Sequence, residues 1–448
     1  MTALAWTLGV VVFVLGIGAS IALHEIGHLV PAKKFGVKVT QYMVGFGPTI
    51  WSRRRGETEY GVKWVPLGGY IRMIGMFPPK PGTDPRFVRS SSTGRMGLLV
   101  ESARQQSLEE IQPGDEHRVF YRLSVPRKIV VMLGGPTMNL VIAAVLLTVS
   151  MAGLGVQSLV PTVSSVSQCI LPAGTADRQC TPGDQPAPAA AAGLRPGDRL
   201  VSFDGHPIRT WDDATQAIRG AGGRTVGFVV ERDGRRLTLS AAIPLSQRPV
   251  LDAQGNPVTA ADGSYRTTPA GFLGVSPSVG MERQPVTAVP GALWDGFTRT
   301  ASVVVRIPQK MVGIVQAAFG SGQRDPNGPI SVVGVARAAG EIASSHDIPF
   351  VQTFRERLSY FVSLLASLNL ALFVFNLIPL LPLDGGHVAG ALWEGLRRAV
   401  ARVRRRPDPG PADVARLLPI AYAMSTVLIV MSVLLIYADI VKPVRLGG

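Results

Sequence analysis

The stretch SIALHEIGHLV, residues 20–30, completes a membrane-length apolar run that carries no charge from Ala3 to Leu23. Polar side chains are costly at such a place. His24 and His28 are four residues apart, so on a helix they lie one turn apart on one face and can hold one metal ion. Glu25 is placed to act as general base toward a water on that metal. The alternative is a helix end whose histidines meet lipid headgroups or loop carbonyls.

Length and composition favour a membrane protein with additional domains. The chain has 448 residues, 46% of them hydrophobic, and a mean hydropathy of +0.26. Four apolar runs, at about 4–30, 129–152, 358–382 and 417–441, approach the roughly 20 residues needed to cross a bilayer. The first has no Lys or Arg before it and exceeds the length of a signal-peptide core, so we expect it to remain in the mature protein.

The basic residues indicate an orientation. Residues 31–128 hold 17 Lys and Arg against 8 Asp and Glu by direct count, and RRAVARVRRRP follows the third run at 397–407. By the positive-inside rule both segments are cytoplasmic, and the two termini lie outside the cytoplasm. This placement explains the net charge of +15 without nucleic-acid binding, which we do not expect.

A possible third metal ligand follows the third apolar run, in NLALFVFNLIPLLPLDGG at 369–386. Asp384 comes after a segment broken by Pro379 and Pro382, and backbone broken in this way is tolerated in a membrane only within protein or a water-filled cavity. The first and third runs cross in the same direction, which puts Asp384 on the same side as His24 and His28. Two His and one Asp leave the fourth zinc position open for water. Alternatively, Asp384 only caps the next helix.

Two separated motifs resemble those of one family. HEIGH at 24–28 and NLIPLLPLDGG at 376–386 match HExxH and NxxPxxxLDGG of the site-2 proteases, in particular the bacterial RseP-like intramembrane metalloproteases. GGPTMN at 134–139 and VPLGGYIRM at 65–73 are also similar to family segments. The resemblance implies one zinc ion bound by His24, His28 and Asp384, with Glu25 as catalytic base.

The resemblance also suggests substrate contacts. It implies that Asn376 contacts the substrate or the transition state, and that Gly68, Gly69 and Tyr70 belong to a membrane-associated β-hairpin in a cytoplasmic region at 36–127. The hairpin edge would add a strand to an unwound substrate helix, although it could simply lie at the interface. The segment around Asn139 is expected to aid helix packing.

The segment between the second and third runs resembles a PDZ domain. GLRPGDRLVSFDG at 193–205 carries the resemblance. Its part RLVSFDG reads as a strand, a helix capped by Thr210 or Asp212 follows, and a hairpin turns at 233–234. We expect one such α+β domain at 161–280, outside the cytoplasm, where it gates access or captures peptides. Cys169 and Cys180 form a disulfide there or remain reduced.

The predicted protein is a four-span α-helical membrane protein with a β-hairpin and one extracytoplasmic PDZ domain. Residues 1–152 and 358–448 form two membrane halves, and 281–357 form a linker whose segment 292–319 lies on the outer leaflet as an interfacial helix. The predicted function is a zinc endopeptidase of the bacterial cytoplasmic membrane, active near the cytoplasmic side. The resemblance suggests single-pass substrates such as anti-sigma factors, or remnant signal peptides. A PDZ-bearing scaffold and a divalent-metal carrier are the alternatives.

Overall fold

The computed structural model describes residues 2–79, 95–170, 179–181, 183–251, 258, 265–320, 328–344 and 352–443. The chain forms two compact units. The first combines Met1–Leu154 with Arg283–Gly448, and the second is Gly155–Glu282. The first unit is therefore assembled from two parts of the chain that the second unit separates in sequence.

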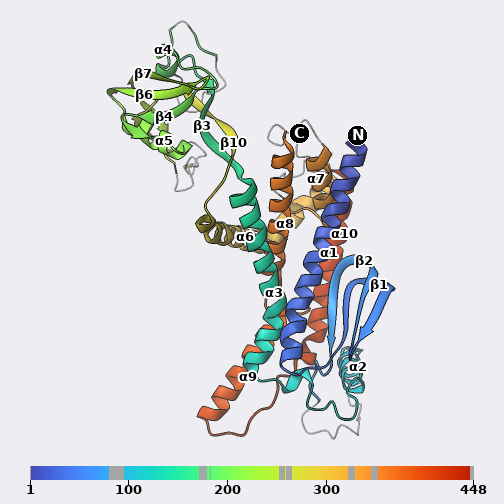
Figure 1. Ribbon diagram of the computed structural model, residues 1–448. Coiled ribbons are helices and arrows are strands. Elements are labelled where there is room, and N and C mark those ends of the chain that lie inside the picture. Colours follow the sequence, from blue (N-terminus) through green and yellow to red (C-terminus); the bar gives the residue numbers. More distant parts are fainter. Residues whose placement is uncertain are drawn as a thin grey trace. The chain divides into compact units, whose positions relative to one another are not determined.

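In the first unit, four helices of the described chain are long and apolar enough to cross a membrane (Figure 1). They match the four predicted apolar runs, but the third helix ends early. Because proline cannot continue a helix, the break at residues 377–383 separates that helix from α9 (Asp384–Val403). The four are α1 (Thr2–Lys34), α3 (Val125–Thr148, extended by a π-helical segment Val149–Leu154), α8 (Phe354–Asn376) and α10 (Leu418–Val441).

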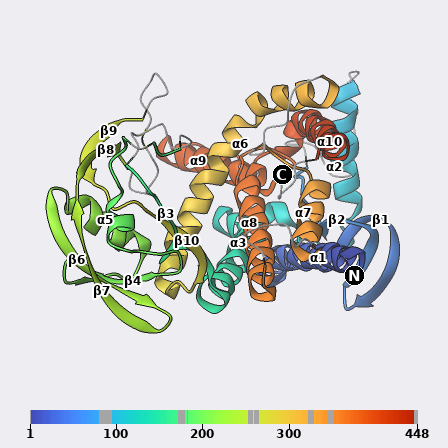
Figure 2. The same cartoon turned by 90° about the horizontal axis from the view of Figure 1, so that it is seen from above.

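The described part of the first unit also contains α2 (Arg95–Glu109), α6 (Val289–Phe319) and α7 (Val332–Ser344). The sequence indicated α6 but not α7, which packs against α1, α8 and α10 (Figure 2). The N-terminus of α7 is held by α10, because the backbone N–H of Ser331 donates to the buried Asp439 carboxylate at 2.6 Å.

The β-hairpin between α1 and α3 folds back on itself. Its strands are β1 (Val39–Arg55) and β2 (Thr58–Met73), and the first half of β1 pairs with both ends of β2. Val44 pairs with Gly69 on one side and with Val62 on the other. The first half of β1 is therefore central, and the GGYIRM end of β2 forms an outer edge that packs against α1.

The second unit is an antiparallel sheet with two short helices, α4 (Pro188–Ala191) and α5 (Trp211–Gly220). The strand order is β10-β3-β4-β6-β7, with β5 beside β4, and β8 pairs with β9 separately. Thr210 caps α5 by accepting the Asp213 N–H. The strands are β3 (Val156–Val166), β4 (Arg199–Phe203), β5 (His206–Pro207), β6 (Arg224–Arg232), β7 (Arg235–Ile243), β8 (Leu245–Pro249), β9 (Thr267–Gly271) and β10 (Val275–Glu282).

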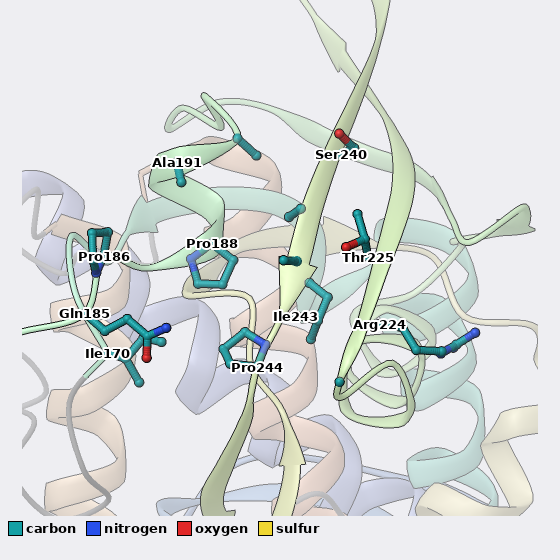
Figure 3. A pocket seen from close by; sticks show the side chains of 14 residues that line it. Ile170, Gln185, Pro186, Pro188, Ala191, Arg224, Thr225, Ser240, Ile243 and Pro244 are labelled. Carbon is teal, nitrogen blue, oxygen red and sulfur yellow. The ribbon is translucent and has the colours of Figure 1, made fainter.

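A disulfide joins Cys169 to Cys180, with an S–S distance of 2.07 Å. A pocket of about 450 Å³ is lined by Ile170, next to Cys169, and by residues of α4, β6 and β7. Pro188, Ile243 and Pro244 lie close together in this pocket (Figure 3). The pocket is mainly lined by small and apolar side chains, so it suits binding better than catalysis.

Candidate metal centre

The first two predicted ligands are neighbours on α1. The Nε2 atoms of His24 and His28 lie 3.2 Å apart, and the His28 side chain is buried. The helix continues through both residues to Lys34, so helical spacing alone sets the pair.

Asp384 meets this pair from the first position of α9. Its Oδ2 atom lies 3.4 Å from His24 Nε2 and 3.3 Å from His28 Nε2. The three side chains are the candidate metal ligands that come together in the described part of the chain. Ligand atoms about 2.0–2.1 Å from a tetrahedral zinc ion are themselves about 3.3 Å apart, so these distances suit zinc. Asp384 Oδ2 is also buried without a satisfied hydrogen bond, as expected of an oxygen that faces a cation.

Helix α3 orients both imidazoles from behind. The Nδ1 atom of His28 lies 2.8 Å from the Val131 carbonyl oxygen, to which it donates when it carries the ring hydrogen. The His24 Nδ1 atom lies 3.1 Å from the Asn139 amide nitrogen. If that amide is turned by half a rotation, its buried and unpartnered Oδ1 accepts the Nδ1 hydrogen instead. Both rings then direct the lone pair of Nε2 toward Asp384, which is the form that binds metal.

Glycines of the GGP segment allow this close approach. A side chain at Gly135 would overlap His28 Nε2 and stand 2.7 Å from His24 Nε2. A side chain at Gly134 would overlap the Gly27 carbonyl. Helices α1 and α3 are therefore in backbone contact beside the two histidines. The sequence indicated the packing role of this segment but not its contact with the rings.

Glu25 lies on α1 next to the hairpin edge. The residue is 7% exposed, and a Cβ at Gly69 would stand 2.9 Å from its Cγ. Gly68 has φ +106°, and a side chain there would meet the Phe46 ring. The GG pair thus lets the strand pass directly over the glutamate.

Two other predicted residues make no hydrogen bond to the three candidate ligands within the described part of the chain. The Tyr70 hydroxyl donates to Gln41 Oε1 at 3.3 Å, so its ring points along the hairpin. Asn376 is half-buried at the end of α8, and among the described residues it makes no hydrogen bond to the three candidate ligands.

The sequence matches the pattern of peptidase family M50 over residues 12–406. This chain belongs to peptidase family M50. Like the site-2 proteases that it resembles, the M50 protease is a membrane-integral zinc metalloendopeptidase acting on membrane proteins.

The M50 protease is similar to bacterial zinc metalloproteases along most of its length. It is 35% identical to zinc metalloprotease Rip1 of Mycobacterium tuberculosis (strain H37Rv) over 448 residues, covering 98% of both chains. Identity to Rip1 of Mycolicibacterium smegmatis is 33% over 456 residues, again 98% of each. Zinc metalloprotease RasP of Geobacillus kaustophilus is 23% identical over 433 residues, covering 87% of this chain and 90% of that protein.

A buried ion pair fastens the helix that carries Asp384. Lys128 of α3 donates to Glu394 of α9 at 2.7 Å, and both side chains are at most 6% exposed. The Ala412 backbone N–H donates to the same carboxylate at 3.0 Å. In the M50 protease, α3 therefore contacts both histidines and also holds α9. The sequence did not predict this pair. Its only signal was a lysine in the apolar segment of α3 and a glutamate in the amphipathic segment of α9.

Proposed function

We propose that His24, His28 and Asp384 bind the catalytic zinc ion of this protease and that Glu25 is its general base. The observation that carries this proposal is the set of three ligand atoms 3.2–3.4 Å apart with Glu25 adjacent in sequence to the first of them. A bound zinc ion lowers the pKa of a water and polarises a peptide carbonyl. Glu25 accepts the proton of the attacking water and passes it to the departing amine nitrogen. Asn139 and the Val131 carbonyl keep the two rings oriented.

A Glu25→Gln variant tests this assignment. The amide keeps the size of the side chain but cannot accept the proton, so we expect zinc content to remain and cleavage of a model transmembrane substrate to fall by about 100-fold or more. Zinc analysis and substrate cleavage on the same purified sample are the measurements. A Glu116→Gln variant, at an exposed carboxylate away from the cluster, serves as control. Normal cleavage by zinc-loaded Glu25→Gln protein would refute the role of Glu25.

The substrate segment is proposed to lie extended along the outer edge of β2. This edge pairs with β1 on one side only, and at Gly69 its backbone passes the Glu25 side chain. A peptide must leave its helical form before its backbone carbonyl can reach the metal, and added strand pairing satisfies the groups that are released. Gly68 and Tyr70 flank this contact, and Asn376 is proposed to meet the substrate from the end of α8.

The biological substrates are proposed to be single-pass membrane proteins such as anti-sigma factors, or remnant signal peptides. The second unit is proposed to be a PDZ domain outside the cytoplasm, at about 161–280, that limits access by size or captures peptides. Two forms of one substrate, with the external part intact or trimmed, are offered to the wild type and to Ala242→Trp, in which the new side chain fills the pocket of Figure 3. The cleavage of each form separates the two roles. A size limit survives the substitution, whereas capture in this pocket is lost.

A further inference from the structure

The helix α9 carries an exposed apolar stripe. Leu392, Trp393 and Leu396 are each more than half exposed, and Val403 is 84% exposed. With Val400, these five side chains recur at the spacing of one helix face and fall within an arc of roughly 120°. The opposite face holds Glu394 against α3. Unlike α1, α3, α8 and α10, α9 is not among the helices long and apolar enough to cross a membrane.

Arginines border this stripe. Arg397 and Arg404 follow one margin of the arc, and Arg402 lies beyond the other. Trp393, Leu396 and Val400 line a groove of about 320 Å³ whose margin includes Arg397, Arg404 and Arg406. Within the described residues, ion pairs are formed by Arg398 but not by Arg402, Arg404, Arg405 or Arg406. The helix therefore presents apolar side chains and uncompensated positive charge to the same side.

We propose that this face of α9 binds the anionic surface of a lipid bilayer, and that the contact fixes the tilt of the helix whose first residue is Asp384. A helix with an apolar stripe and a basic border lies in the interface plane, with its long arginine side chains reaching the lipid phosphates. Charge complementarity selects anionic lipid over a neutral surface. The Lys128–Glu394 pair transmits the position of α9 to the helix behind the two histidines. The part that concerns Asp384 rests on its proposed role as a zinc ligand.

A spin label on the stripe tests the docking. Because Cys169 and Cys180 are joined, a new cysteine in Leu396→Cys is the single site for a nitroxide. The full chain is placed in vesicles of phosphatidylcholine alone or mixed with phosphatidylglycerol. In the mixed vesicles we expect the label to be relaxed by oxygen and shielded from a water-soluble nickel chelate. A label at the exposed Asp408→Cys should be reached by nickel in both vesicles.

Charge removal separates lipid binding from simple burial. Substituting Arg402, Arg404 and Arg406 by Gln in the labelled protein should lower the ratio of docked to released helix by roughly 100-fold and restore nickel access. The matched control replaces three exposed arginines of the second unit, Arg209, Arg235 and Arg236, and should leave the shielding unchanged.

The outcomes are distinct. Equal nickel access in the two vesicles, or shielding that survives the loss of the three α9 arginines, overturns the lipid proposal. Dipolar broadening between labels that disappears on dilution with unlabelled protein shows instead that a second copy covers the stripe. The rate of zinc loss is measured on the same samples. We expect zinc to be lost faster from protein whose α9 helix is not docked on the bilayer. If the helix docks but zinc release is unchanged, only the coupling to Asp384 is overturned and the lipid contact stands. None of these readouts depends on cleavage.

Discussion

At the scale of single residues, two glycines stand on opposite sides of the proposed catalytic group. A methyl group at Gly135 would overlap His28 and crowd His24, whereas one at Gly69 would press on Glu25. We expect Gly135→Ala to lose zinc and cleavage together, because both rings must move. Gly69→Ala should retain zinc and lose most cleavage, because the new methyl group displaces Glu25 and the hairpin edge at Met43 but touches neither histidine ring. Zinc content and cleavage of a model substrate distinguish the two variants.

Gly114→Ala in an exposed loop, where no atom stands within 4 Å of the new methyl group, is the corresponding control for handling and yield, although its φ of +96° adds local strain. Retention of zinc by Gly135→Ala would show that α3 can move away from α1 at no cost to the metal site. Loss of zinc from Gly69→Ala would place the hairpin edge in metal binding and weaken its assignment to the substrate.

At the scale of elements, α3 and α9 are held together by Lys128 and Glu394. Because removing one member leaves the other charge buried, Glu394→Gln should lower the free energy of unfolding by about 3–5 kcal/mol. The double variant Lys128→Met with Glu394→Leu should recover part of this loss, since apolar side chains can replace the buried pair but not the acceptor of the Ala412 N–H. Denaturation of the detergent-solubilised protein measures both. A double variant no more stable than Glu394→Gln would contradict this account.

A second element-scale prediction concerns Asp198 in the second unit. Burial raises the pKa of this carboxyl group, but hydrogen bonds from Arg232 at 2.6 Å and from the Arg195 N–H at 2.8 Å outweigh burial and leave the pKa below its ordinary value. A lowered folded-state pKa adds stability that is fully present above the unfolded value of about 3.9 and disappears as pH falls through the folded value.

We therefore expect the sheet of the second unit to lose protection against hydrogen exchange as the pH drops below about 4. Asp198→Asn should be less stable at neutral pH and show less of this acid loss. Asp233→Asn, at the exposed turn between β6 and β7, is the control and should retain it. The same acid loss in Asp198→Asn as in wild type would assign it to other groups.

Local spacing explains which elements could be predicted. The pair of histidines and the four apolar helices follow from periodicity and length. Asp384 was indicated by its place after a proline-broken apolar run, and the family motif then supported it. The Lys128–Glu394 pair joins residues 266 positions apart, so no local pattern marks it. Helix α7 begins directly after Ser331, whose N–H donates to Asp439 of α10, a contact that exists only after folding. The first half of β1 pairs with both ends of β2, and this arrangement forms only when β2 folds back around it.

At the scale of the whole molecule, the basic residues predict which side of the membrane each loop faces. Arg405 follows α9, and Arg235 begins β7 in the second unit; both are exposed. With the native cysteines joined, we expect an impermeant maleimide to label Arg235→Cys in intact cells and Arg405→Cys only in inverted vesicles. Detergent-solubilised protein, in which both should react, is the control. Labelling of Arg405→Cys from outside would reverse the proposed topology.

The proposed metal cluster is completed by a residue more than 350 positions after His28, once the second unit has already been made. A nascent chain on the ribosome therefore carries its two histidines through most of translation without the carboxylate that joins them. If Asp384 is the third ligand, proteolytic activity requires synthesis to reach the last seventh of the polypeptide. We therefore expect fragments from aborted translation, which lack Asp384, to show no proteolytic activity.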